Sequence, residues 1–145
     1  MMETAELPIE AETLLPHRPP MLMIDRLLAF DGSEGTVESV LKPGNPFLDN
    51  DGFLCPPAMV ELVAQSFAAV KGFSDRRAGK AAGKGFLVGV KRFVFFHQAR
   101  LGERLLIRIN QTGETEEFGL AEGRISCGET LLAEGSVMVF VPKEP

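Results

Sequence analysis

The order of apolar and polar residues along the chain predicts one buried helix and a series of strands. Residues 57–71 carry apolar side chains almost all round, which predicts a buried helix rather than a surface helix. Pro57 suits the first turn, where a missing N–H breaks no hydrogen bond, and Gly72 suits a left-handed stop. We expect strands at residues 21–30, 36–42, 85–96, 103–112, 117–126 and 130–141.

One buried helix followed by four consecutive strands predicts an α+β fold, in which an antiparallel sheet wraps around a single helix. The 145 residues match the commonest size of one domain, so we expect a single domain over residues 1–145. Hydrophobic residues make up 45% and charged residues 24% of the chain, which excludes disordered and fibrous classes.

Charge and cysteine content narrow the class of function. Fifteen Lys and Arg against twenty Asp and Glu give a net charge of −5, which opposes broad binding of nucleic acid. Two cysteines and two histidines form no visible zinc cluster, so we expect neither a metal nor another cofactor. The few cysteines suit a reducing compartment. No signal peptide or membrane-spanning run is visible, and we expect a cytoplasmic protein without membrane contact.

Two irregular segments stand out between the predicted elements. Residues 43–57 are dense in Pro, Gly, Asn and Asp, and structureless loops of this length are uncommon outside functional sites. Within this loop, Asp49 and Asp51 are either a source of a second carboxylate or ordinary turn residues. The basic linker at residues 74–85 is either a solvated loop or a docking site for an acidic carrier protein or a CoA phosphate.

The predicted helix carries the pair of polar residues most relevant to chemistry. Glu61 and Gln65 are four residues apart and therefore share one face of the helix. A buried carboxylate is costly unless a partner donates a hydrogen bond to it, and Gln65 is the candidate partner. The pair is either structural, for example at a subunit interface, or a general acid/base held in place by an amide. The spacing alone leaves both interpretations open.

Three motifs occur in order along most of the chain. They are LPHRPPMLMIDR at residues 15–26, MVELVAQ at residues 59–65, and GVKRF at residues 89–93 followed by LGE at residues 101–103. Together they resemble the hotdog-fold 3-hydroxyacyl-[acyl-carrier-protein] dehydratases, with their Leu-Pro-His-Arg opening and Glu-x-x-Ala-Gln helix. The resemblance implies a hotdog fold and a dimer or multiple of dimers. It also implies that Glu61 is the catalytic carboxylate and Gln65 its support.

The chain departs from that family at two places. Where the family has His-Phe-Pro-Gly in the loop before the helix, this chain has FLDN at residues 47–50. The glycine position at the helix start, whose N–H holds the thioester carbonyl in the family, is occupied by Pro56, which has no N–H. The loop instead resembles a divergent subgroup of dehydratases from aryl-polyene-type gene clusters. On this resemblance we assign Phe47, Asp51 and Gly52 to substrate binding.

A replacement for the missing loop histidine has to come from elsewhere in the chain. His17 is the candidate base, because imidazole is the commonest proton carrier near neutral pH. The alternative is a structural histidine that fixes the proline-rich turn around it. His97 fits an ordinary histidine at a strand end, and Cys55 at the helix start is a further candidate nucleophile.

These observations predict a dehydratase that acts on an acyl-carrier-protein or CoA thioester. Glu61 then acts as the acid/base at the C3 hydroxyl of the substrate, and His17 acts on the C2 proton. An acyl thioesterase, with Glu61 or an Asp activating water, is one alternative. A non-catalytic acyl-binding subunit is another, paired with an active hotdog paralogue that supplies the loop histidine. The expected assembly is correspondingly a homo-oligomer or a heterodimer of hotdog subunits.

Overall fold

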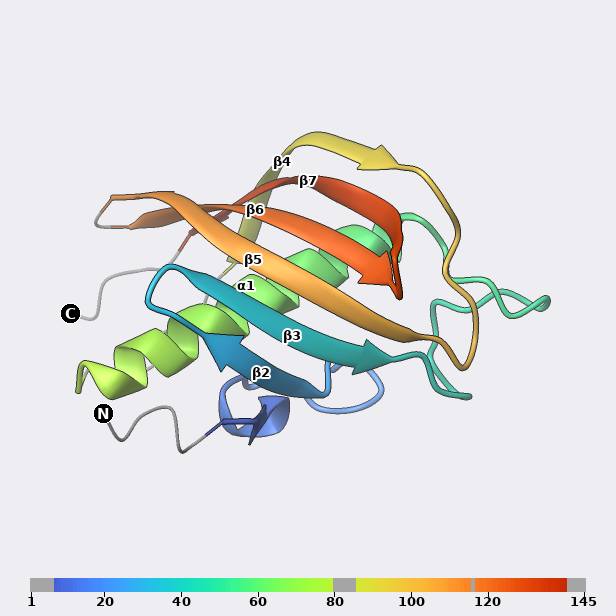
Figure 1. Ribbon diagram of the computed structural model, residues 1–145, viewed down its shortest axis with the longest axis horizontal. Helices are drawn as coiled ribbons and strands as arrows, with labels where there is room; N and C mark the ends of the chain where they lie inside the picture. Colours follow the sequence, from blue (N-terminus) through green and yellow to red (C-terminus); the bar gives the residue numbers. More distant parts are fainter. Residues whose placement is uncertain (1–6, 80–85, 116, 141–145) are drawn as a thin grey trace.

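In the computed structural model, one long helix is enclosed by a curved antiparallel sheet (Figure 1). The structure describes residues 7–79, 86–115 and 117–140. The strands are β1 (Ile9–Glu10), β2 (Arg26–Phe30), β3 (Glu34–Val40), β4 (Phe86–Phe95), β5 (Arg104–Glu114), β6 (Phe118–Cys127) and β7 (Thr130–Phe140). A short 3₁₀ helix, η2 (Ala11–Thr13), follows β1, and α1 (Pro57–Arg77) lies between β3 and β4 in the chain. The seven described strands are arranged in the order β1-β2-β3-β5-β6-β7-β4.

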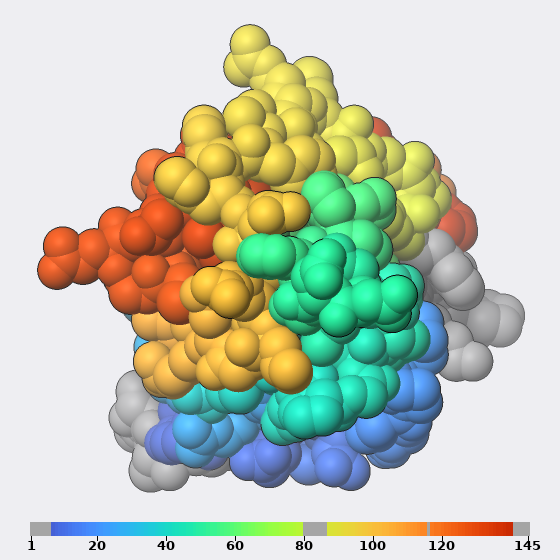
Figure 2. Space-filling model, turned by 90° about the vertical axis from the view of Figure 1, so that its right-hand side faces the viewer, coloured from blue at the N-terminus to red at the C-terminus, as the bar shows by residue number. Residues whose placement is uncertain are grey.

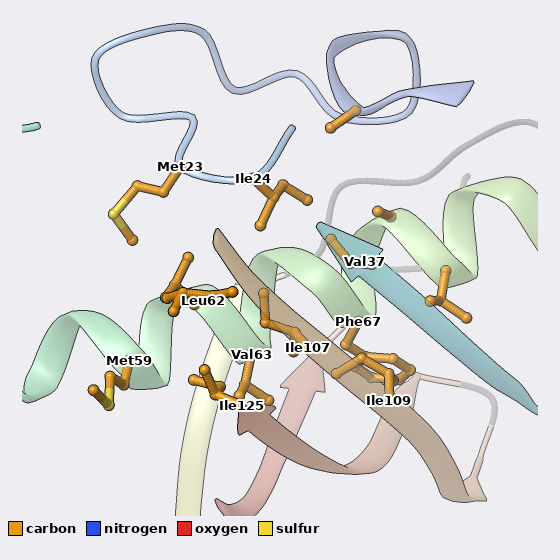
Figure 3. Packing of buried hydrophobic residues seen from close by; sticks show 14 of the residues in the cluster. Met23, Ile24, Val37, Met59, Leu62, Val63, Phe67, Ile107, Ile109 and Ile125 are labelled. Carbon is orange, nitrogen blue, oxygen red and sulfur yellow. The ribbon is translucent and has the colours of Figure 1, made fainter. Parts of the chain in front are cut away.

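The core lies between α1 and the concave face of the sheet. Along β5 and β6, alternate side chains are buried against the helix and the others are exposed, which is the two-residue period of a sheet with one covered face. Figure 3 shows helix side chains packing against isoleucines of these strands, among them Leu62, Phe67, Ile107 and Ile125. Each large apolar side chain buried in this way contributes about 1.5–3 kcal/mol to folding. The predicted buried helix is therefore confirmed.

Two glycines of β6 allow the helix to lie close to the sheet. A Cβ atom added at Gly123 would lie 2.5 Å from Cγ1 of Val63, and one added at Gly119 would lie 2.8 Å from Cζ of Phe67. Both distances are far below van der Waals contact, so a larger residue at either position would push the helix outward. The absence of side chains at these positions sets the spacing between the two layers.

The helix end was predicted wrongly. The helix does not stop at Gly72 but continues to Arg77, and the predicted linker therefore begins as helix, while residues 80–85 lie outside the described part. A Cβ atom at Gly72 would lie 3.0 Å from the carbonyl oxygen of Leu14, so the packing of the N-terminal segment explains this glycine. Among the described residues, no helix is long and apolar enough to cross a membrane.

The strands from β3 onward lie within about two residues of their predicted positions, but the strand predicted at residues 21–30 begins only at Arg26. The preceding residues form a turn, in which the backbone N–H groups of Met21 and Leu22 both donate to the carbonyl oxygen of Arg18. Met23 and Ile24 are buried beneath this turn without joining the sheet. Their apolar character reflects burial against the helix rather than strand pairing.

A buried carboxylate ties three strands together on the outer face of the sheet. Glu38 of β3 is only 6% exposed and lies between Arg104 of β5 and Arg26 of β2. Arg26 donates to Glu38 Oε1 through Nη2 at 2.7 Å and through Nε at 2.9 Å. The hydrogen bond from Arg104, followed by the hydrogen bond and charge of Arg26, lowers the pKa of Glu38.

We expect Glu38→Gln to lower the free energy of unfolding by about 1.5–3 kcal/mol at pH 7, because hydrogen bonds to a charged group are lost. Because folding lowers the pKa of Glu38, its full stabilisation of the fold is present above the pKa of the unfolded state, near 4.5. The stabilisation is lost as the pH falls through the lower pKa of the folded state. Urea denaturation at pH 7 and at pH values below 4.5 measures the difference. The exposed control Glu122→Gln should change stability by less than about 0.5 kcal/mol. A pH-independent difference between wild type and Glu38→Gln would contradict this account.

We expect Gly123→Ala to destabilise the protein by about 1–3 kcal/mol, because the added methyl group meets Val63. Val63→Ala removes the opposing methyl groups, so the double variant should be more stable than the sum of the two single effects predicts. Urea denaturation of the four proteins in this cycle measures the coupling. Strict additivity would show that this contact does not set the spacing between helix and sheet.

Candidate active site

A buried glutamine joins the helix to the proline-rich segment that precedes β2. Gln65 of α1 is 1% exposed, and its Oε1 accepts a hydrogen bond of 2.9 Å from the N–H of Met23. Its Nε2 donates to the carbonyl oxygen of Met21, also at 2.9 Å. Because both ends of the amide are bonded to backbone groups, the side chain has a fixed orientation.

The same amide holds the neighbouring carboxylate. Nε2 of Gln65 also donates to Oε2 of Glu61, one helical turn earlier, at 2.8 Å. The side chain of Glu61 is 34% exposed, and its Oε1 has no hydrogen-bond partner among the described residues. One carboxylate oxygen is therefore fixed, while the other is available to an incoming group.

His17 lies next to this carboxylate. Its Nε2 is 4.0 Å from Oε2 of Glu61, and its side chain is 33% exposed. Nδ1 of His17 is buried and has no hydrogen-bond partner within the described part of the chain. The backbone beside it is held by Arg18, whose Nη1 donates to the carbonyl oxygens of His17 at 2.7 Å and Leu15 at 2.9 Å.

The structure thus brings together three of the residues singled out in the sequence, namely Glu61, Gln65 and His17. The carboxylate and the imidazole are too far apart for a direct hydrogen bond, yet both can reach one small group placed between them. An acid and a base in this arrangement can move two protons on a single substrate. The contributions of Arg18 and of the backbone at Met21 and Met23 were missed, although a fully buried glutamine is itself a signal of unseen partners.

The loop between β3 and α1 contains the residues assigned to substrate binding, Phe47, Asp51 and Gly52. This loop packs beside the segment after β4 (Figure 2). The carbonyl oxygen of Gly52 accepts from the N–H of Leu101 at 2.7 Å. The N–H of Asp51 donates to the carboxylate of Asp49, as in an ordinary turn. Asp51 and Gly52 line a surface hollow of about 410 Å³, whereas Phe47 packs against the core. Neither Glu61 nor His17 lines that hollow, so these residues are not joined to the pair within this chain.

The start of α1 offers no free amide to a developing oxyanion. Pro56 and Pro57 have no N–H, and the N–H of Cys55 donates to the carbonyl oxygen of Phe47. The next N–H groups, of Ala58 and Met59, donate to the carbonyl oxygens of Cys55 and Pro56, each three residues back. Every backbone donor in this stretch is therefore missing or occupied. The oxyanion contact used in the resembling family is not available here.

His97 lies two residues beyond the end of β4, close to its predicted position at a strand end. It lines a hollow of about 140 Å³ at the start of α1, together with Pro56 and Met59 and the aromatic residues Phe95 and Phe96. Its side chain is exposed, and no hydrogen bond or ion pair joins it to the described residues. His97 thus serves as a reference histidine outside the Glu61 pair.

One helix wrapped by an antiparallel sheet defines a hotdog protein, and solved structures confirm this class. A subunit of the dehydratase heterocomplex ApeI:P from Xenorhabdus doucetiae superposes with a TM-score of 0.87 at 25% identity, over 94% of this chain and 93% of that chain. Zebra fish thioesterase superfamily member 2 superposes with a TM-score of 0.66 at 16% identity, over 88% of either chain. The second likeness concerns the fold alone.

Sequence relatives identify the family. The family model described as ApeP dehydratase, of the ApeP-like group, matches residues 9–145. The 3-hydroxyacyl-[acyl-carrier-protein] dehydratase FabZ of Natranaerobius thermophilus is 31% identical over 133 residues, which cover 88% of this chain and 92% of that protein. The FabZ of Pelotomaculum thermopropionicum is 27% identical over 136 residues, covering 91% and 96%. The chain belongs to the ApeP-like dehydratase family, as the motifs and the loop predicted.

We expect Gln65→Met to lower the free energy of unfolding by about 1–3 kcal/mol, because the buried N–H of Met23 and the carbonyl of Met21 lose their partner. Methionine approximates the volume of glutamine, so packing changes little. Urea denaturation measures the effect, and Gln98→Met, at an exposed position, is the matched control. Equal stability of the two variants would mean that the amide does not anchor the segment.

Proposed function

We propose that this chain is a catalytic dehydratase subunit that eliminates water from a 3-hydroxyacyl thioester carried by acyl carrier protein or CoA. The observation that carries the proposal is the pairing of Glu61 with His17 in one chain, at 4.0 Å, with both side chains accessible. The hydrogen bond from Gln65 supports it, because it orients the carboxylate. The FabZ relatives, which are 3-hydroxyacyl-[acyl-carrier-protein] dehydratases, support the substrate class.

In the proposed reaction, Nε2 of His17 accepts the proton from C2 of the substrate. The electron pair of that C–H bond forms the C2–C3 double bond, and the C3–O bond breaks. Glu61, in its protonated form, donates its proton to the departing hydroxyl, which leaves as water. His17 is then protonated and Glu61 ionised, and the proton returns from His17 to Glu61 through the released water, because Nε2 and Oε2 lie 4.0 Å apart. The side chains contribute only proton transfers, which an imidazole and a carboxyl group can perform.

The thioester carbonyl needs a hydrogen-bond donor that the start of α1 does not offer. We infer that a second hotdog subunit completes the site. In support, β4 has no described strand on its outer side, and five of its apolar side chains are exposed, namely Leu87 (40%), Val88 (52%), Val90 (48%), Val94 (45%) and Phe95 (43%). An open apolar edge of this kind calls for a partner. The related solved structure is itself a heterocomplex of dehydratase subunits.

A second candidate is a non-catalytic subunit that binds the acyl thioester and supports an active paralogue. The occupied or missing N–H groups between Cys55 and Met59 favour this candidate. In that case Glu61 and Gln65 form a structural pair, and the catalytic histidine comes from the partner. The two candidates predict different results when the acid and base of this chain are removed.

The test is a dehydration assay with a short 3-hydroxyacyl thioester on either carrier, using the chain both alone and with any hotdog subunit that co-purifies. Product is followed by enoyl absorbance and by mass. We expect Glu61→Gln and His17→Ala each to lower kcat by at least about 100-fold, while His97→Ala changes it by less than about twofold. Folding of each variant is checked by urea denaturation.

Other outcomes decide between the candidates. Unchanged turnover of the complex carrying Glu61→Gln and His17→Ala would assign catalysis to the partner. Release of free acid instead of enoyl thioester would indicate a thioesterase. Loss of activity in Glu61→Gln alone would retain the dehydratase and remove His17 from the mechanism.

A further inference from the structure

Two cationic residues occupy the middle of the open edge strand. Lys91 and Arg92 lie at the centre of β4, which pairs with β7 on one side and with no described strand on the other. Both side chains are exposed, and neither forms an ion pair or a side-chain hydrogen bond within the part of the chain that the structure describes. An edge strand with unpaired charges at its centre constrains which strand can be added to it.

The backbone directs both charges to the outer face of the sheet. Lys91 pairs with Ser136 and Val94 with Glu134, so two residues of β4 are opposite one residue of β7. This bulge places Arg92 in the left-handed region, with φ of 55°. Arg92 lines an outer-face hollow of about 290 Å³ that also contains Ser136 and Glu134.

A second copy of this chain would meet these charges with its own. Antiparallel pairing of β4 with the β4 of another copy requires a two-fold axis across the strands. Such an axis keeps every side chain on its own face of the sheet, so it passes beside a residue rather than between two residues. An axis near the centre of Phe86–Phe95, beside Val90 or Lys91, places the Lys91 side chains of the two copies either diagonally or directly opposite each other. Like charges opposite each other on paired strands are destabilising.

We propose that the β4 edge selects a non-identical hotdog subunit whose pairing strand carries Asp or Glu side chains opposite Lys91 and Arg92. The inference rests on the proposed function for the kind of partner, and adds the charge that the partner must carry. Opposite charges across paired strands stabilise the correct pair, and the same residues disfavour self-pairing. The preference for the acidic partner weakens at high salt, because salt screens exposed charges.

The test uses a charge-inverted copy of the chain as the acidic partner. Sedimentation equilibrium measures the dissociation constant of wild type alone, of Lys91→Glu/Arg92→Glu alone, and of their mixture. We expect the mixture to form a 1:1 dimer with a Kd at least about tenfold lower than that of either protein alone. The difference should shrink as the salt concentration rises.

Two further variants make the result specific. Lys91→Gln removes the cation nearest the axis, so we expect it to self-associate more tightly than wild type. Arg108→Gln introduces the same charge change on β5, three strands away from the edge, and should leave self-association unchanged. Wild type that binds itself as tightly as it binds the charge-inverted copy would overturn the proposal. Association is measured without substrate, so this failure is distinct from a failure of the dehydration assay.

Discussion

The site depends on one buried amide whose hydrogen bonds have to be made. Gln65 is almost completely excluded from solvent, and its three hydrogen bonds go to Met21, Met23 and Glu61. Because an unpaired buried amide is costly, the proline-rich segment must lie against α1 for the fold to be stable. The same constraint orients the carboxylate and brings His17 to its side. Stability of the fold and geometry of the site therefore have a common origin.

The periodic parts of the fold could be predicted from the sequence, because burial repeats along a helix or strand. The alternation in β5 and the apolar run of α1 show this directly. Gly72 was misinterpreted because a glycine marks either a left-handed stop or a close approach of backbone, and here the approach of Leu14 explains it. Met23 and Ile24 were assigned to a strand because buried apolar residues look alike in a sequence, whatever they pack against.

For the site, the spacing of Glu61 and Gln65 placed both on one face of the helix, and the motifs pointed to His17. The partners of Gln65 were missed because they are backbone atoms 42 and 44 residues away, and backbone atoms carry no sequence signature. The role of Phe47 stays a prediction, since its loop does not reach the pair within one chain. Among the described residues, the open β4 edge and the helix start without free donors both support the proposal that a second subunit completes the site.

The most direct measurement is NMR of the two histidine rings, which can be followed separately because the chain contains only His17 and His97. If Gln65 holds the carboxylate and the proline-rich segment together, Glu61→Gln and Gln65→Met should each shift the ring signals of His17. The signals of His97 should not move in either variant. Unshifted His17 signals in the folded variants would contradict the account, because the imidazole would then lie outside the influence of Glu61.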